Sequence, residues 1–332
     1  MENQPNMFCY QCQETVRGKG CEQKGVCGKH AGTSTKMDLL LYAVSGISAI
    51  NRALRAKGQA STEASHAVMD SLFTTITNAN FDNDSIDDYI RRAFDVKKYL
   101  LGKAKEQRVD LPELPHVEFF ATPDEAEKYK AVTGVLAEKN EDIRGLKQLA
   151  IYGCKGMAAY ARHAANLGYE DDEVYAVIEN AMAETARTDI GIGELLPLVM
   201  KVGDGGVNVM ALLDRANTET YGNPEITKVD IGVRNRPGIL ISGHDLKDLE
   251  ENSLNRPPEK ALMYILTPRC FPVNTIRRSR NILILPVITE TRGGARPMSS
   301  KNSTAYFCSH PIASYPRVAD AHISIAYIRP VW

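Results

Sequence analysis

The sequence predicts a mainly α-helical protein that has a cysteine-rich amino-terminal loop and the beginning of an α/β domain. Apolar residues recur at helical spacing to about residue 222, and an alternation typical of strands follows. Four of the seven cysteines lie within the first 27 residues. We expect a cysteine loop over 1–36, a helical domain of two antiparallel bundles over 37–222, and an incomplete, Rossmann-like α/β domain that starts at 223–254.

Composition narrows the possible environments and partners of the chain. Its 332 residues are 43% hydrophobic and 24% charged, which is ordinary for a soluble globular protein. A formal net charge of -1 gives no reason to expect nucleic acid or a membrane surface as a partner. The first residues lack the features of a signal peptide, and cysteines at metal-ligand spacing favour a reducing compartment. We therefore expect a cytoplasmic protein with no nucleic-acid or membrane partner.

The amino-terminal cysteines are spaced like metal ligands. Cys9 and Cys12 are separated by two residues, Cys21 follows after eight more, and Cys27 after another five. Thiolates select zinc, copper(I) or iron-sulfur clusters. Zinc modules usually contain two short cysteine knuckles, and only the first pair here has that spacing. The order also departs from the common ferredoxin runs. An iron-sulfur cluster, zinc and unliganded cysteines all remain open from spacing alone.

The first group of helices follows the loop. Met37 to Arg55 and Thr62 to Thr77 each place apolar residues on one face, and Ser85 to Asp88 resembles a capping box that opens a third helix. The stretch from Leu111 to Pro123 contains three prolines and predicts a linker between the two bundles.

The second group consists of four periodic segments, most of them followed by glycine. Glycine after a helical run is the usual left-handed stop, so we expect helices to end before Gly168, Gly203 and Gly222. Within the first segment, Gly153 and Gly156 predict close packing between helices, and Cys154 between them is expected to be a small buried hydrophobe. The segments are Asp142–Leu167, Asp172–Thr185, Glu194–Val202 and Val207–Tyr221.

Strand patterns begin after residue 222. Ile226 to Ile231 alternates apolar and polar residues, Gly238 to Ser242 is a short apolar run, and a helix is expected over Leu246–Leu254. His244 would then lie at the carboxyl end of a strand, where open α/β sheets place ligand and catalytic groups. A histidine in that position is also commonly structural. The remaining candidates, His30, His66, His116 and His163, have no partner at metal spacing and are expected to be structural or solvent-facing.

Several longer motifs are distributed along the chain. They are Met7–Thr15, Gly20-Cys21, Gly25–Lys29, Lys155–Ala161, Leu212–Thr218, Tyr221-Gly222 and Gly238–Leu249. Together these motifs resemble one family, the hybrid-cluster proteins, also called hydroxylamine reductases. The resemblance covers residues 7 to about 254, which leaves Met7 as a candidate start.

This resemblance implies two metal centres. Cys9, Cys12, Cys21 and Cys27 match the ligands of a 4Fe-4S cluster in the tightly spaced version of the family, and His244 matches an iron ligand of the hybrid Fe-S-O cluster. The implied reaction is the two-electron reduction of hydroxylamine to ammonia and water, with nitric oxide as another candidate substrate. The electron donor is not indicated. A non-enzymatic Fe-S electron carrier or a zinc-stapled helical protein is the alternative.

The segment 255–332 differs from the rest. It holds eleven basic and three acidic side chains and nine of the 16 prolines, and the only cysteines after His244 are Cys270 and Cys308. Residues 262–272 and 305–316 can be encoded by bases that, read one position earlier, spell phrases resembling family segments with cluster ligands. We interpret 255–332 as an out-of-frame tail without the family fold. The chain is then truncated and inactive. A strand pair begun at Ile226 and Ile239 is expected to lack its following strands and to keep an unpaired apolar edge that invites aggregation.

Overall fold

The computed structural model describes residues 7–12, 15–76, 80–223 and 247, together with the strands at 238–242, 263–266, 284–285 and 305–309. The chain forms two compact units. The first contains Met1–Ala165 and Tyr169–Leu213, and the second contains Asn166–Gly168 and Asp214–Trp332.

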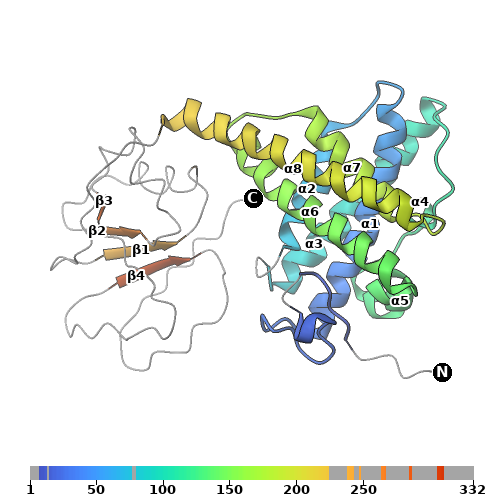
Figure 1. Ribbon diagram of the computed structural model, residues 1–332, viewed down its shortest axis with the longest axis horizontal. Helices are drawn as coiled ribbons and strands as arrows, with labels where there is room; N and C mark the ends of the chain where they lie inside the picture. The colour runs from blue at the N-terminus through green and yellow to red at the C-terminus, as the bar shows by residue number, and fades with distance from the viewer. Residues whose placement is uncertain are drawn as a thin grey trace. The chain divides into compact units, whose positions relative to one another are not determined.

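Helices dominate the described residues, as the sequence predicts (Figure 1). Short 3-10 turns lie at Val16–Gly18, Pro123–Glu125 and Val135–Ala137. The helices are α1 Ala31–Arg55, α2 Thr62–Thr74, α3 Asn83–Glu106, α4 Pro115–Glu118, α5 Ala126–Thr133, α6 Glu141–Asn166, α7 Asp172–Thr185 and α8 Ile192–Tyr221.

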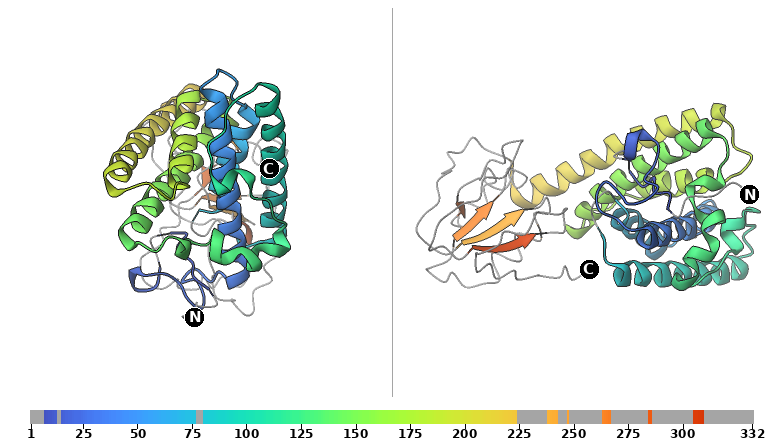
Figure 2. Two further views of the ribbon diagram at one scale, coloured as in Figure 1. Left: turned by 90° about the vertical axis from the view of Figure 1, so that its right-hand side faces the viewer. Right: turned by 90° about the horizontal axis from the view of Figure 1, so that it is seen from below.

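Helix α1 is the centre of the first unit. It contacts α2, α3, α4, α5 and α7, and its residues from Met37 to Asn51 are all buried. The left view of Figure 2 shows α1 in blue between helices of the first predicted group and those of the second. Buried side chains of both groups form one continuous hydrophobic cluster. The two predicted bundles therefore share a core, because α1 packs against α3 on one side and α7 on the other.

The structure corrects two predicted helix ends. Ser85 is not the first cap of α3, because the Asp82 side chain accepts a hydrogen bond from Asp84 N at 3.0 Å and starts the helix earlier. Gly203 does not stop a helix, since α8 runs unbroken from Ile192 to Tyr221. A Cβ on Gly203 would have nothing within 4 Å, whereas Gly205, two residues later, lies where helices pack closely. A Cβ on Gly205 would lie 2.7 Å from the Met157 side chain.

Among the other glycine predictions, three are confirmed and one is wrong. Gly168 and Gly222 have φ values of +83° and +90°, which confirms them as left-handed helix stops. A Cβ on Gly153 would lie 2.4 Å from Val202 Cγ1, so the prediction of close helix packing is confirmed there. It is wrong for Gly156, where nothing lies within 4 Å. Cys154 between them is fully buried, as expected.

The predicted linker at 111–123 contains the short helix α4, which docks on α1 and α3 through its backbone. The carbonyl oxygen of His116 faces Gly46 of α1 and accepts a hydrogen bond from Lys97 Nζ at 3.0 Å. Lys97 also donates to the carbonyl of Phe119, and its ammonium lies 4.4 Å from the Phe120 ring centroid. A linker with few local structural signals is thus tied into the core by one buried lysine.

His116 gives this region a predictable pH dependence. Its ring stacks on Tyr42 with centroids 3.7 Å apart, and burial lowers its pKa to about 4, with the charges of Lys97 and Lys147 acting in the same direction. Below about pH 6.5 the unfolded chain binds a proton at His116, whereas the folded chain does so only below about pH 4. The folding free energy that the buried neutral ring contributes is therefore lost as the pH falls from about 6.5 to about 4. We expect urea unfolding to show that the wild type loses roughly 2–3 kcal/mol more than His116→Phe over this range. Parallel pH curves would contradict the assignment.

The strands of the second unit form a parallel sheet in the order β3-β2-β1-β4. The strand pair begun at Ile226 and Ile239 was expected to lack its following strands and to keep an unpaired edge. For the second of these strands, β1 (Gly238–Ser242), that expectation is wrong, because β2, Met263–Leu266, pairs with one side and β4, Ala305–Ser309, with the other. The remaining strand, β3, is Ile284–Leu285. An out-of-frame origin for 255–332 and a Rossmann-like topology stay predictions. The predicted strand 226–231 lies outside the described residues, as does the helix 246–254 apart from residue 247.

Helix α8 also meets the length and composition criteria for a membrane-spanning helix, alone among the helices in the described part of the chain. Core helices of soluble proteins pass the same test, so this is weak evidence. One face of α8 is buried against the first unit at Leu195, Leu198, Val202 and Val209. The opposite face exposes apolar side chains such as Met200 and Val207.

Candidate metal centre

The cysteine loop is closed by a pair of backbone hydrogen bonds. Cys9 N donates to Cys21 O, and Cys21 N donates to Cys9 O, each at 2.9 Å, so the two residues form an isolated antiparallel bridge. Both side chains are buried, at 6% and 4% exposure, and pack with Met7. Cys12 and Cys27 are half-buried. The bridge brings the first and third cysteines together although eleven residues separate them.

Glycines shape the chain around these cysteines. Gly20 precedes Cys21 with φ of +148°, and a Cβ there would lie 2.6 Å from the Phe8 ring. On the other side, Gly25 N donates to Lys29 O at 2.9 Å and closes the turn that carries Cys27. A Cβ on Gly25 would lie 3.0 Å from Cys27 Sγ. Both glycines therefore leave room that a larger residue would take from the loop.

Helix α6 anchors the loop through two of its side chains. Tyr152 Oη donates to Tyr10 O at 2.7 Å, and the two rings lie 6.1 Å apart. One turn further along the same face, Lys155 Nζ donates to Gln11 O at 3.1 Å and to Gln11 Oε1 at 2.7 Å. The backbone between Cys9 and Cys12 is thus held by two residues of one helix.

Helix α1 adds a buried carboxyl group to the same network. Gln11 Nε2 donates to Asp38 Oδ1, so one glutamine side chain connects Lys155 of α6 to Asp38 of α1. Lys29 lies at the end of the loop, and its Nζ is 2.9 Å from Met37 Sδ. Asp38, Lys29 and Lys155 are 6%, 3% and 2% exposed. Two buried lysines and one buried aspartate therefore surround the cysteine loop.

Burial shifts the proton affinities of these groups. It raises the pKa of Asp38 to about 7, an effect that the charges of Lys155 and Lys29 oppose. It lowers the pKa of Lys155 to about 7 together with the charge of Lys29, while Asp38, Cys9 and Cys12 act in the opposite direction. Burial also raises the pKa of the Cys9 thiol, against the lowering effect of Lys29. Lys29 thus partly offsets the burial that disfavours the thiolate form of Cys9, the form that a metal ligand requires.

The loop suits an iron-sulfur cluster by its donor set. All four cysteines are free thiols, and the bridge between Cys9 and Cys21 holds two of them in one place. Within the described residues, no three or more Cys, His, Asp or Glu side chains converge on a point where one ion could bind. The four cysteines of a four-iron cluster bind different irons and need not converge on one point.

His244, the predicted ligand of the second centre, lies outside the described residues, and so does Cys270. Cys308 belongs to β4, where its backbone is paired with Ile241 of β1. Two of the other predicted histidines have structural contacts. His66 Nε2 lies 3.0 Å from Glu170 Oε2, and the ring of His163 meets that of Phe73 edge to face.

Comparison with known proteins identifies the family. Residues 7–253 match the Prismane/CO dehydrogenase family, which is most of the chain. The chain belongs to this family. A hydroxylamine reductase of Porphyromonas gingivalis is 51% identical over 246 residues, and one of Bacteroides fragilis is 50% identical over 247. One of Clostridium novyi is 47% identical over 249 residues. Each match covers 74% of this chain and 45% of the relative, so the chain spans about half the length of these curated relatives.

Among solved structures, a carbon monoxide dehydrogenase of Thermococcus sp. AM4 aligns with 98% of this chain and 51% of its own at 13% identity. The TM-score of 0.27 is too low to carry an argument about fold.

In this member of the Prismane family, sequence reasoning missed the residues beneath the loop. Lys155 stands beside Cys154 on a helix segment whose neighbours Met157 and Ala158 are buried, and Asp38 interrupts a run of buried apolar residues in α1. A charged residue at a core position was the available signal, because such residues are rarely buried without a partner.

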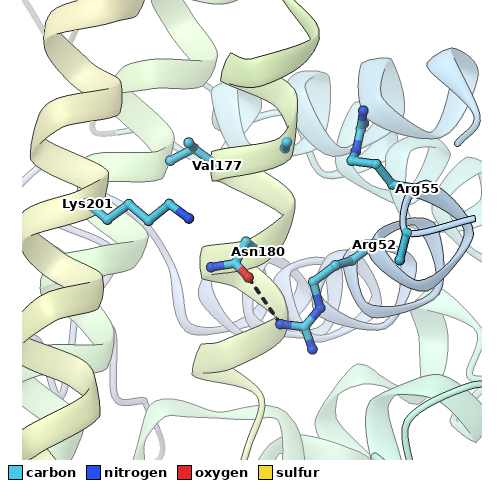
Figure 3. A pocket seen from close by; sticks show the side chains of 7 residues that line it. Arg52, Arg55, Val177, Asn180 and Lys201 are labelled. Atoms are coloured by element: carbon cyan, nitrogen blue, oxygen red, sulfur yellow. Dashed lines mark hydrogen bonds between the residues drawn. The ribbon is translucent and has the colours of Figure 1, made fainter. Parts of the chain in front are cut away.

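A shallow pocket of about 310 Å³ lies elsewhere on the first unit, between α1, α7 and α8 (Figure 3). Its two arginines are already paired. Arg52 Nη1 donates to Asn180 Oδ1 at 3.3 Å and forms an ion pair with Glu184, while Arg55 pairs with Glu179 at 3.1 Å. None of the four loop cysteines lines this pocket. It is therefore separate from the candidate metal centre.

Proposed function

We propose that Cys9, Cys12, Cys21 and Cys27 hold a 4Fe-4S cluster that relays electrons to a hybrid Fe-S-O cluster, where hydroxylamine is reduced. The observation that carries this proposal is the closed cysteine loop, seated on two buried lysines, in a chain 51% identical to a hydroxylamine reductase over 246 residues. The assignment of His244 as an iron ligand of the second centre is part of the same proposal.

The proposed reaction consumes two electrons and two protons. The N–O bond of hydroxylamine breaks, nitrogen leaves as ammonia and oxygen leaves as water. Iron would supply Lewis-acid polarisation of the nitrogen substrate when it is bound. Nitric oxide is a second candidate substrate of the same centre, and the electron donor is a partner of unknown identity.

The residues of the first unit contribute placement and charge. The Cys9–Cys21 bridge fixes two ligands, and Tyr152 with Lys155 holds the segment between Cys9 and Cys12 on α6. Cys12 and Cys27 are only half-buried, so an electron donor could approach the loop at these two residues.

Metal analysis of anaerobically purified protein tests the proposal. We expect about four iron and four acid-labile sulfide per chain, and an EPR signal of a reduced cubane after dithionite treatment. One zinc per chain without iron would contradict the cluster and support a zinc-stapled protein.

The same sample tests the second centre. After His244 the sequence has only Cys270 and Cys308, so we expect no hybrid-cluster signal from the 332-residue chain and no turnover of hydroxylamine. Hydroxylamine-dependent oxidation of a reduced dye by this chain would contradict the expected inactivity while leaving the cubane assignment intact.

A further inference from the structure

We propose that Lys155 is a positioning residue that holds the turn between Cys9 and Cys12 and whose positive charge raises the reduction potential of the cluster bound there. This inference rests on the proposed function, because it concerns the cluster assigned to the four cysteines. It adds a residue of α6, far from the cysteines in sequence, to the determinants of the electron-transfer properties of the centre.

The hydrogen bonds of Lys155 account for the positioning role. Its ammonium donates to Gln11 O at 3.1 Å, to Gln11 Oε1 at 2.7 Å and to Thr75 O at 3.2 Å. An ammonium has three donors, so its capacity is fully used. Two of the three bonds fix Gln11, which lies between Cys9 and Cys12. The third ties the same nitrogen to the end of α2, so α6, α2 and the loop meet at one atom.

None of the described hydrogen-bond acceptors of Lys155 carries a negative charge that would neutralise its ammonium group. All three are neutral oxygens, and Asp38 is reached only through the Gln11 side chain. Burial and the charge of Lys29 lower the pKa of Lys155 to about 7 in the absence of metal, and the charges of Asp38, Cys9 and Cys12 act to raise it. Thiolates and reduced iron-sulfur clusters are anionic, so a bound cluster favours the protonated ammonium still more.

A buried cation beside the loop favours the reduced state of the cluster. Reduction adds one negative charge, and a positive charge in a medium of low dielectric stabilises that charge more than a solvated lysine would. Cluster potentials respond to net charge and hydrogen bonding in their surroundings. Lys155 is 2% exposed, so solvent does little to screen its charge.

The test compares Lys155→Met with a matched control on the same helix, Lys147→Met. Lys147 is also buried, at 9% exposure, and its Nζ donates to Arg187 O at 2.7 Å and pairs with Glu138 at 3.1 Å, away from the cysteines. In an EPR-monitored redox titration of cluster-loaded protein at one pH, we expect Lys155→Met to bind the electron at least tenfold more weakly. For a one-electron couple this is a shift of about 59 mV to more negative potential. The control variant is expected to have the same cluster reduction potential as the wild type.

Each other outcome is also decisive. A loaded Lys155→Met protein with the wild-type potential would overturn the inference. Lys155→Met could keep its helical circular dichroism and still retain no iron, and in that case Lys155→Arg is the deciding variant. If Lys155→Arg binds iron and its cluster has the wild-type potential, the role of the charge is supported. If Lys155→Arg binds no iron, the inference is overturned. Wild-type protein without iron would instead defeat the proposed function, and this inference with it.

Discussion

Replacement of Cys21 by serine is expected to abolish iron binding by this chain. Cys21 is 4% exposed, and its backbone is bonded to that of Cys9, so no other cysteine can take its place without opening the bridge. A serine hydroxyl at neutral pH is a poor ligand for iron in a cluster, where thiolate is preferred. Iron and acid-labile sulfide per chain after anaerobic reconstitution measure the effect, and we expect a loss of at least tenfold.

The matched control for this experiment is Cys154→Ser. Cys154 is fully buried in α6, one residue from Lys155, and burial raises its pKa to about 12, which keeps the thiol protonated. It belongs to the hydrophobic core and is not assigned as a ligand, so we expect this variant to keep the iron content of the wild type. Equal iron in Cys21→Ser and the wild type would remove Cys21 from the ligand set.

Replacement of Gly46 by alanine is expected to be strongly destabilising. Gly46 lies in the buried middle of α1, and a Cβ there would be 2.2 Å from His116 O and 3.2 Å from the Lys97 side chain. The carbonyl belongs to backbone that Lys97 holds in place, so it cannot move without losing a buried hydrogen bond. Overpacking of this kind costs typically about 1–3 kcal/mol, and the lost bond adds about 1 kcal/mol. Urea unfolding of the apo-protein should show a loss of about 2–4 kcal/mol.

Gly102→Ala is the control for the alanine substitution. Gly102 lies in an exposed position of α3, and a Cβ there would have nothing within 4 Å, so alanine should stabilise the helix by about 0.5–1 kcal/mol. A destabilisation of Gly46→Ala no larger than the gain at Gly102 would show that α4 is not docked on α1 by its backbone.

Helices α7 and α8 show which helix bounds can be predicted from the local sequence and which cannot. The bounds Asp172–Thr185 were predicted correctly, because apolar periodicity and an acidic amino-terminal cap agree there. In α8 the glycine at 203 was misinterpreted as a stop. Sequence cannot distinguish a glycine that ends a helix from one inside a helix, since the packing of Gly205 against Met157 and Val177 depends on two other helices.

In the candidate site, too, the sequence predicted the residues that are close together in the chain and missed those that are far apart. Spacing alone identified Cys9, Cys12, Cys21 and Cys27 as candidate metal ligands, because ligands of one loop are close in the chain. The Lys155 that holds this loop is 144 residues from Gln11, and periodicity carries no information about such a pair. Only a charged residue within a buried helix face hinted at it.

By itself, the sequence predicted the four cysteines as metal ligands and determined the mainly helical fold and, through long motifs, the family. The tertiary structure decided which helices share a core and which charges surround the cysteines. The physical reason is that metal-ligand spacing and helical periodicity are properties of short segments. The electrostatic environment of the centre exists only when α1, α2 and α6 pack together and bring Asp38, Thr75 and Lys155 to the loop.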